Sequence, residues 1–215
     1  YFGSSLNYIS SLSSRKFKIN YNKFENYLKF GFRTLCNDNE TFFKEIISLD
    51  PGCNLILDDK LKFKKKEYWA PKKITIKNSL NYQKEKKNLT KTFKNVLKKR
   101  LRSDFPMACL LSGGIDSSSI VSEASKMSNK NIHCFSVKPK DKDYDEDKYI
   151  QTIVKRKNIK HKYVNIKKDN NKNLLHLKNV IQSTGNIVPT STYLIFSLLC
   201  KKIKSEKFKV LLTGY

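Results

Sequence analysis

The chain has 215 residues, enough for one large domain or two small ones with hydrophobic cores of their own. Its formal net charge of +25 invites a nucleic-acid function, but 39 of its 44 basic residues are Lys and only 5 are Arg. Arg makes the bidentate contacts that read bases and phosphates, and scattered Lys runs such as 64–66 and 84–87 are typical of solvated faces, so the composition argues against specific nucleic-acid binding.

The cysteines and the hydropathy pattern exclude two further classes. The five cysteines include no Cys-x-x-Cys pair, and His133, His161 and His176 complete no zinc pattern. Cys109 and Cys134 fall inside predicted buried strands, where a free thiol acts as a small hydrophobe and fits a reducing compartment. No apolar run approaches the ~20 residues of a membrane span, and no signal peptide is visible. We therefore expect a cytoplasmic protein without a membrane partner.

The first part of the chain is predicted to combine a short helix with a hairpin. Tyr21–Phe30 has the apolar spacing of an amphipathic helix and is followed by Gly31, a common helix terminator. Asp50-Pro51-Gly52 is a turn sequence, and the runs Cys53–Leu57 and Leu61–Lys65 can pair as a hairpin. This part differs from the rest of the chain and is expected to form a separate domain.

A polar stretch follows and leads into a predicted helix. Residues 72–88 are rich in Lys and Asn with little apolar periodicity, as in a linker. Leu89–Leu101 is predicted to be a packing helix, with Leu89, Phe93, Val96 and Leu97 on one face.

The remaining sequence alternates strands and helices. Strands are predicted at Met107–Leu111, Ile132–Val137, Lys162–Ile166 and Lys209–Thr213, and helices at Asp116–Ser128, Asp145–Lys157, Asn173–Ser183 and Ser191–Lys204. Repeated strand–helix units imply an α/β fold: a parallel sheet with right-handed crossovers and helices on both faces. Ligands of such sheets bind at the carboxyl ends of the strands, so the loops after Leu111, Val137 and Leu212 are expected to converge on one site.

The first of these loops carries the strongest functional signal. It reads Leu110-Leu111-Ser112-Gly113-Gly114-Ile115-Asp116-Ser117-Ser118. A strand that opens into a helix through glycines forms a phosphate cradle, because backbone N–H groups point inward and the helix dipole favours negative charge. The serines add hydroxyl donors, and Asp116 can cap the helix or hold a metal ion that bridges phosphate oxygens. A Walker loop would need a Lys after the glycines, and a Rossmann fingerprint would need a third glycine.

The order Ser-Gly-Gly-x-Asp-Ser after an apolar strand resembles the PP-loop of the ATP pyrophosphatases. That resemblance implies that the loop binds the β,γ-diphosphate of ATP and that the enzyme cleaves between the α and β phosphates. The plain structural alternative is a glycine turn capped by serines.

The chain as a whole resembles glutamine-dependent asparagine synthetase, a class II glutamine amidotransferase. Phe2–Leu6, Tyr27–Gly31, Thr41–Lys44, Leu49–Gly52 and Tyr68-Trp69 resemble the closing section of its glutaminase domain, and Phe135–Val137, Tyr144–Glu146 and Leu211–Gly214 resemble its synthetase domain. The resemblance implies that residues 1–71 are the C-terminal part of an Ntn-type α+β glutaminase domain. Residues 72–88 would be a linker, and residues 89–215 the N-terminal part of a PP-loop domain of the adenine nucleotide alpha hydrolase type. We expect the chain to be a piece of a longer protein, inactive by itself.

This family resemblance also implies the chemistry. Mg-ATP activates the side-chain carboxylate of aspartate as an acyl-adenylate, and ammonia derived from glutamine displaces AMP to give asparagine, with pyrophosphate as the other product. ATP and Mg²⁺ are therefore the implied cofactors, and aspartate with glutamine or ammonia the implied partners. The oligomeric state stays open, with a homodimer as one candidate.

Site residues follow from the same resemblance by position. The pyrophosphate would be held by Ser112, Gly113, Gly114, Asp116, Ser117 and Ser118, with Asp116 also touching magnesium. Leu111 and Val137 would frame adenine and ribose, although both could equally be ordinary strand core. Thr213 and Gly214 would line the nucleotide, with a plain turn as the alternative. No catalytic residue is assigned, because none of the five cysteines is N-terminal and the family's Gly-x-Gly-x-Asp-Glu segment lies beyond Gly214-Tyr215.

One departure from the family leaves the acceptor open. The region where the family often has Asp-Glu-Pro reads Thr184-Gly185-Asn186-Ile187-Val188-Pro189 here, in a loop that helps to shape the acceptor site. An alternative is therefore a PP-loop enzyme that forms an amide or lactam on another carboxylate. A further alternative is a Lys-rich RNA-binding module or tRNA-modifying enzyme. The first 70 residues argue against it, because they resemble the end of a glutaminase domain.

Overall fold

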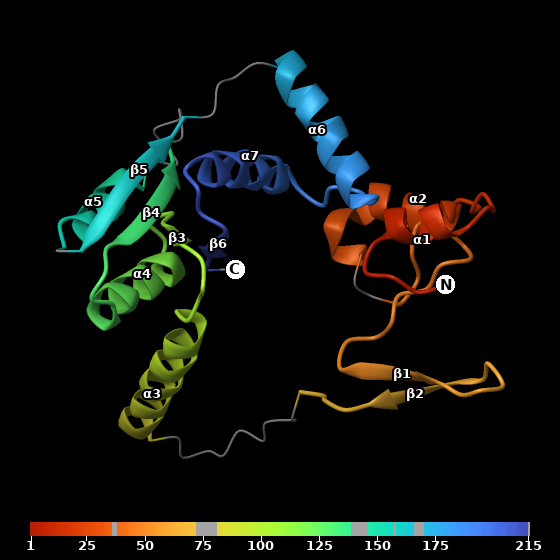
Figure 1. Ribbon diagram of the computed structural model, residues 1–215, viewed down its shortest axis with the longest axis horizontal. Helices are drawn as coiled ribbons and strands as arrows, with labels where there is room; N and C mark the ends of the chain where they lie inside the picture. The colour runs from red at the N-terminus through yellow and green to blue at the C-terminus, as the bar shows by residue number, and fades with distance from the viewer. Residues whose placement is uncertain (36–37, 72–80, 139–145, 157, 166–169, 215) are drawn as a thin grey trace. The chain divides into compact units, whose positions relative to one another are not determined.

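The computed structural model describes residues 1–35, 38–71, 81–138, 146–156, 158–165 and 170–214 (Figure 1). By contacts the chain divides into two compact units. The first comprises Tyr1–Ile76 and Leu174–Tyr193, and the second Lys77–Asn173 and Leu194–Tyr215. The segment Leu174–Tyr193 thus packs with the N-terminal residues, whereas family resemblance groups it with the PP-loop part. The family domain boundaries at 71 and 89 remain a prediction.

A four-stranded parallel sheet forms the centre of the second unit, which confirms the predicted α/β class. Its order is β5–β4–β3–β6, with β3 at Met107–Leu110, β4 at Ile132–Val137, β5 at Ile159–Val164 and β6 at Val210–Leu212. All three pairings are parallel. Because β3 lies between β4 and β6, the loops that leave these three strands start at the same edge of the sheet.

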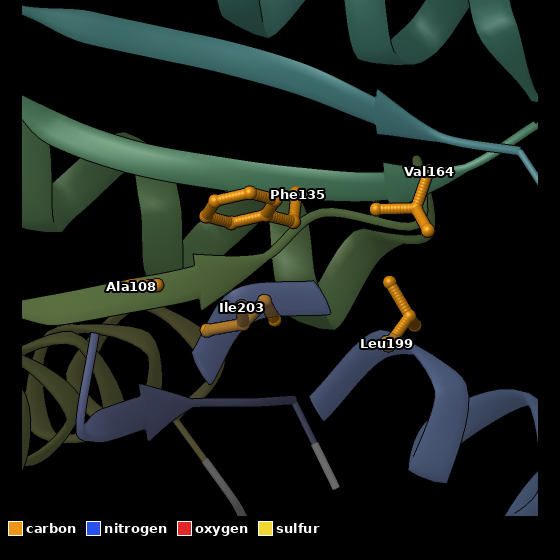
Figure 2. Close-up of a cluster of buried hydrophobic side chains, with 5 residues drawn as sticks. All are labelled: Ala108, Phe135, Val164, Leu199 and Ile203. Carbon is orange, nitrogen blue, oxygen red and sulfur yellow. The ribbon is translucent and has the colours of Figure 1, made fainter. Parts of the chain in front are cut away.

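Helices cover both faces of this sheet, and the strand residues alternate between them. Cys109 and Leu111 pack with Val121 of α4 (Ile115–Met127) and Ile150 of α5 (Asp147–Val154) on one face. On the other face, residues of β3, β4 and β5 pack against α7 (Ser191–Ser205), as Figure 2 shows for Ala108, Phe135, Val164, Leu199 and Ile203. Burial on both faces explains why the sequence of β3 is continuously apolar and that of β4 mostly so.

The N-terminal unit contains short elements with polar caps. Its helices are α1 (Leu6–Leu12), α2 (Tyr21–Phe30), the 3-10 turn η1 (Gly31–Thr34) and most of α6 (Asn170–Thr184). Strands β1 (Cys53–Leu57) and β2 (Phe63–Glu67) form an antiparallel hairpin. Gly31 ends α2 with a φ of 69°, as its sequence position predicts.

Two side chains of the N-terminal residues hold the C-terminal end of α6 and the loop after it. Asn7 Nδ2 donates to the carbonyl of Gln182 at 2.5 Å, and the Tyr27 hydroxyl donates to the carbonyl of Val188 at 3.2 Å. Orphan carbonyls at a helix C-terminus need such donors, so these bonds explain why this segment packs with residues far away in sequence.

The predicted elements differ from the structure chiefly at their boundaries. Helix α3 spans Tyr82–Arg100, so the part of the predicted linker from 82 to 88 is helical, and residues 72–80 lie outside the described residues. The Asn81 side chain caps this helix by accepting from Lys84 N. Residues 83–87 are Gln, Lys and Glu, which favour helix without apolar periodicity. Helix α1 was not predicted.

Two predicted strands are displaced along the sequence. Strand β2 begins at Phe63 instead of Leu61, because Leu61 has a φ of 59° in a turn where the Asp58 carboxylate accepts from two backbone N–H groups. Strand β5 begins at Ile159 instead of Lys162, since it pairs with the whole of β4, and the predicted end at Ile166 lies outside the described residues.

None of the helices in the described part of the chain has the length and hydropathy that a membrane span requires.

Candidate functional site

The predicted cradle lies between β3 and α4, where the backbone requires glycine. Gly113 has a φ of 95°, and a Cβ built on it would lie 2.7 Å from Glu146 Cβ and 3.0 Å from the Glu146 carbonyl oxygen. Any larger residue would therefore be strained and would push against the residue that begins α5. Gly114, at a φ of −65°, is the N-cap of α4 and supplies no side-chain cap. The first N–H groups of α4 are thus left for another acceptor.

Ser112 and Ser117 form an internal hydrogen-bond network in this loop. Their hydroxyl oxygens lie 2.9 Å apart, the Ser117 oxygen accepts from Ser112 N at 3.2 Å, and the Ser112 oxygen accepts from Gly114 N at 3.3 Å. The Ser117 hydroxyl also lies 3.2 Å from the Gly114 carbonyl. These two serines, which the sequence places among the phosphate-binding residues, therefore hold the shape of the loop in this structure.

Ser118 differs from them. Its hydroxyl oxygen is buried and finds no hydrogen-bond partner among the residues that the structure describes. Such a group costs roughly 1–3 kcal/mol unless something binds it. Ser118 is also one of the residues that line an open groove beside the cradle.

That groove has a volume of about 1200 Å³ and lies between the cradle and helices α3, α4 and α5. The predicted site residues on its wall are Gly113, Gly114, Asp116, Ser118, Thr213 and Gly214. The structure therefore brings the loop after β3 together with the loop after β6, as the parallel topology predicts. Gly214 is close enough to the start of α4 that a Cβ would lie 3.0 Å from Ser117 N.

Two predicted residues lie in the core instead of on this wall. Leu111 is 1% exposed and packs in the cluster under α4 and α5. Val137 packs on the opposite face, against the cluster that includes α7. Backbone contacts of either residue with a nucleotide remain a prediction, and the loop after Val137 lies outside the described residues from 139 to 145.

Carboxylates and one lysine supply the charge around the groove. Asp116 in the first turn of α4 and Glu146 at the start of α5 both line it, as does Lys94 of α3. Lys94 Nζ lies 3.7 Å from Glu123, whose pKa is lowered mainly by its hydrogen bond with Lys126. Glu146 and Lys94 were not predicted as site residues, because only the folded chain brings α3 and α5 to the cradle.

The donor set fits a divalent cation that is bound together with a phosphate. In the part of the chain that the structure describes, no group of three or more His, Cys, Asp or Glu side chains could hold a metal ion alone. Mg²⁺ usually keeps several water ligands and takes only one or two carboxylates in addition to substrate phosphates. Asp116 at the wall of an anion cradle has the oxygen chemistry that this mode of binding needs.

Comparisons with known proteins find one matching family model and several similar proteins. The family model of asparagine synthase matches residues 88–215. A protein of Methanocaldococcus jannaschii named as a candidate glutamine-hydrolysing asparagine synthetase is 33% identical over 144 residues, which cover 66% of this chain and 27% of that protein. The amidase chyE of Penicillium rubens is 30% identical over 126 residues, which cover 51% of this chain and 18% of that protein.

Among solved structures, the NH3-dependent NAD synthetase from Campylobacter jejuni in complex with the nitrate ion is 18% identical, with a TM-score of 0.35. That match covers 62% of this chain and 56% of the synthetase chain.

The chain spans about a quarter or less of the length of the two curated relatives named above. Since the family model covers more than half of the chain, including the whole cradle, this chain belongs to the asparagine synthase family.

Proposed function

We propose that this chain provides the ATP-binding part of a synthetase that forms an amide from a carboxylic acid and ammonia. The acid would be aspartate, activated on its side chain as an acyl-adenylate, and ammonia from glutamine would displace AMP to give asparagine. The observation that carries the proposal is the cradle itself. A glycine-dependent backbone, the start of α4 without a side-chain cap, and Ser118, whose hydroxyl has no partner among the described residues, all adjoin one groove. Membership of the asparagine synthase family supports this assignment.

The chemistry explains why ATP is needed. A carboxylate is a poor electrophile, because ammonia would have to expel an oxide or hydroxide ion from it. Transfer of AMP to the carboxylate oxygen turns that oxygen into a good leaving group and releases pyrophosphate. The first N–H groups of α4 and the Ser118 hydroxyl would bind the oxygens of the departing pyrophosphate, where negative charge grows during the transfer.

Magnesium and the last loop complete the proposed roles. Asp116 would hold Mg²⁺, which neutralises phosphate charge when it is bound. Thr213 and Gly214 would lie along the nucleotide, because Gly214 packs against the start of α4. Residues 1–71 would belong to a glutaminase domain that supplies ammonia.

A second acceptor is favoured by one observation in the N-terminal unit. Gly185 has a φ of 65°, and a Cβ on it would lie 2.4 Å from Asn7 Oδ1. The loop Thr184–Pro189, which departs from the family's Asp-Glu-Pro, thus contains a backbone position that requires glycine and adjoins Asn7. One relative is named an amidase and not an asparagine synthetase. The alternative is therefore amide or lactam formation on another carboxylate.

Equilibrium binding tests the proposal on the chain as it stands. Calorimetric titration should show that Mg-ATP binds and that pyrophosphate competes with it. The variant Ser118→Ala should weaken binding, whereas Ser125→Ala should not, because Ser125 lies away from the groove and its hydroxyl donates to Ser122 O. Failure of Mg-ATP and of pyrophosphate to bind would refute the assignment.

Product analysis then separates the two acceptors. The complete synthetase should release pyrophosphate and AMP in the presence of aspartate and ammonia. Release that depends on a different carboxylic acid, with none on aspartate, would establish the alternative.

A further inference from the structure

A buried serine and a histidine connect the middle of the sheet to the cradle. Ser136 of β4 is 2% exposed, and His161 lies on the neighbouring strand β5. His161 Nε2 and Ser136 Oγ are 2.8 Å apart. The Ser136 hydroxyl also hydrogen-bonds to the carbonyl oxygen of Leu111, the last residue before the cradle. No role in the proposed reaction accounts for this polar pair, which joins β4 to β5.

The direction of both hydrogen bonds follows from the atoms involved. A carbonyl oxygen can only accept, so the single hydroxyl proton of Ser136 points to Leu111. The Ser136 oxygen is then left with lone pairs, and it must accept from His161. His161 therefore carries a proton on Nε2. Its pKa is lowered mainly by burial, opposed by the nearby Asp147 carboxylate, so it is neutral at pH 7 with the proton on this nitrogen.

Leu111 is the point at which this pair acts on the loop. Its N–H donates to Phe135 O at 3.0 Å, which continues the pairing of β3 with β4 beyond the end of β3. The Leu111 carbonyl and the Ser112 N–H belong to one planar peptide group, so fixing the carbonyl also fixes the direction of that N–H. The Ser112 N–H in turn donates to Ser117 Oγ at 3.2 Å, the first bond of the network that shapes the cradle.

The neighbours of His161 hold its ring in place. The ring lies edge-on to Tyr163, with centroids 4.4 Å apart and planes at 88°. The Tyr163 hydroxyl donates to Asp147 and accepts from Gln151 Nε2 at 3.0 Å, both in α5. Helix α5 begins directly after Glu146, which contacts Gly113. The same cluster thus reaches both the start and the glycine of the cradle.

We propose that Ser136 and His161 are positioning residues, which orient the Leu111–Ser112 peptide and thereby preorganise the cradle for phosphate. The pair touches no substrate, and its effect on the reaction rests on the proposed function of the cradle. What His161 contributes is an N–H donor at a fixed place, so the proposal predicts that another donor with the same reach can replace it.

Three variants test this proposal in the 215-residue chain. Ser136→Ala and His161→Phe remove the hydroxyl and the donor, whereas His161→Gln keeps an N–H at about the position of Nε2. The first two should raise the Kd for Mg-ATP by roughly five- to tenfold, the usual effect of losing one hydrogen bond to a positioned group. His161→Gln should bind within about twofold of the wild type. Matched controls are Ser125→Ala and His133→Phe; His133 lies on the same sheet against Phe208.

If Ser136 and His161 only stabilised the fold, the variants would lower stability without this pattern of Kd values. If both His161 variants bind Mg-ATP equally well or equally badly, the proposal is wrong. If Ser136→Ala fails to fold, the comparison of His161→Phe with His161→Gln still decides.

Hydrogen exchange of the Ser112 amide tests the positioning role of Ser136 and His161 independently of the proposed function. The Ser112 amide should exchange faster in Ser136→Ala and His161→Phe than in the wild type and His161→Gln, with or without nucleotide. If the wild type binds no Mg-ATP but the exchange pattern appears, the proposed function fails and the positioning pair stands. Unchanged exchange at Ser112 in all variants would overturn the pair itself.

Discussion

Replacing Gly113 by alanine is the sharpest perturbation of the cradle. At a φ of 95° an L-residue is strained by about 1–3 kcal/mol, and the new Cβ would lie 2.7 Å from Glu146 Cβ and 3.0 Å from the Glu146 carbonyl. The second of these atoms is backbone, so relief requires the start of α5 to move. We therefore expect Gly113→Ala to lower the free energy of unfolding by about 2–4 kcal/mol and to abolish measurable Mg-ATP binding.

The neighbouring glycine provides the matched control. Gly114 has a φ of −65°, and the nearest atom to a Cβ built there is Ser112 Oγ at 3.4 Å. Gly114→Ala should therefore cost less than about 1 kcal/mol and keep most of the nucleotide affinity. Urea unfolding and calorimetry of the two variants measure both quantities. Equal losses at the two positions would refute the argument from backbone strain and the Glu146 contact.

The remaining predictions concern the loop hydroxyls, the last glycine and the histidines. Ser118→Ala should leave the free energy of unfolding in urea unchanged or slightly higher, because the Ser118 hydroxyl has no partner among the described residues. Ser117→Ala should lower it by about 0.5–1.5 kcal/mol, because the Ser117 hydroxyl is hydrogen-bonded within the loop. The opposite ranking would contradict the assigned roles. Gly214→Ala should weaken Mg-ATP binding, since its Cβ would lie 3.0 Å from Ser117 N, and unaltered affinity in a titration would argue against the convergence of the two loops. Burial lowers the pKa of His133 and His161 from 6.5, so the unfolded chain binds protons at a higher pH than the folded one. Stability should thus be complete above about pH 6.5 and fall below it, as urea midpoints between pH 8 and 5.5 would reveal, and a flat profile would contradict this linkage.

Where the sequence signal was strong, it came from burial on both faces of a strand. β4 lies at the predicted Ile132–Val137, because a short, mostly apolar run between polar segments is typical of a buried strand. In β5, Ile159, His161 and Tyr163 alternate with lysines. The start of this strand is decided by its pairing with β4, which a single sequence does not reveal. The start of α3 depended on the cap at Asn81 and on residues with intrinsic helix preference, a weaker signal than periodicity.

For the candidate site too, residues with a local sequence signal were predicted and residues that only the fold brings there were missed. Its loop was found from the sequence because glycines, serines and an aspartate occur at fixed spacing after a strand. Glu146 and His161 were missed because they reach the cradle only through strand order and register. The sequence contained one local signal for His161: its partner Ser136 is a polar residue in a buried strand, where a hydroxyl needs a hydrogen-bond partner.

We propose that residues Ser112–Ser118 bind the phosphates of ATP. The most direct measurement is a titration of the uniformly ¹⁵N-labelled chain with Mg-ATP, followed by the backbone amide resonances. We expect the largest shifts on Gly113, Gly114, Asp116 and Ser118. Gly214 should shift with them, and pyrophosphate alone should reproduce the shifts in the loop. Saturable shifts elsewhere in the chain with none in this loop, or no shifts at all at millimolar Mg-ATP, would contradict this proposal.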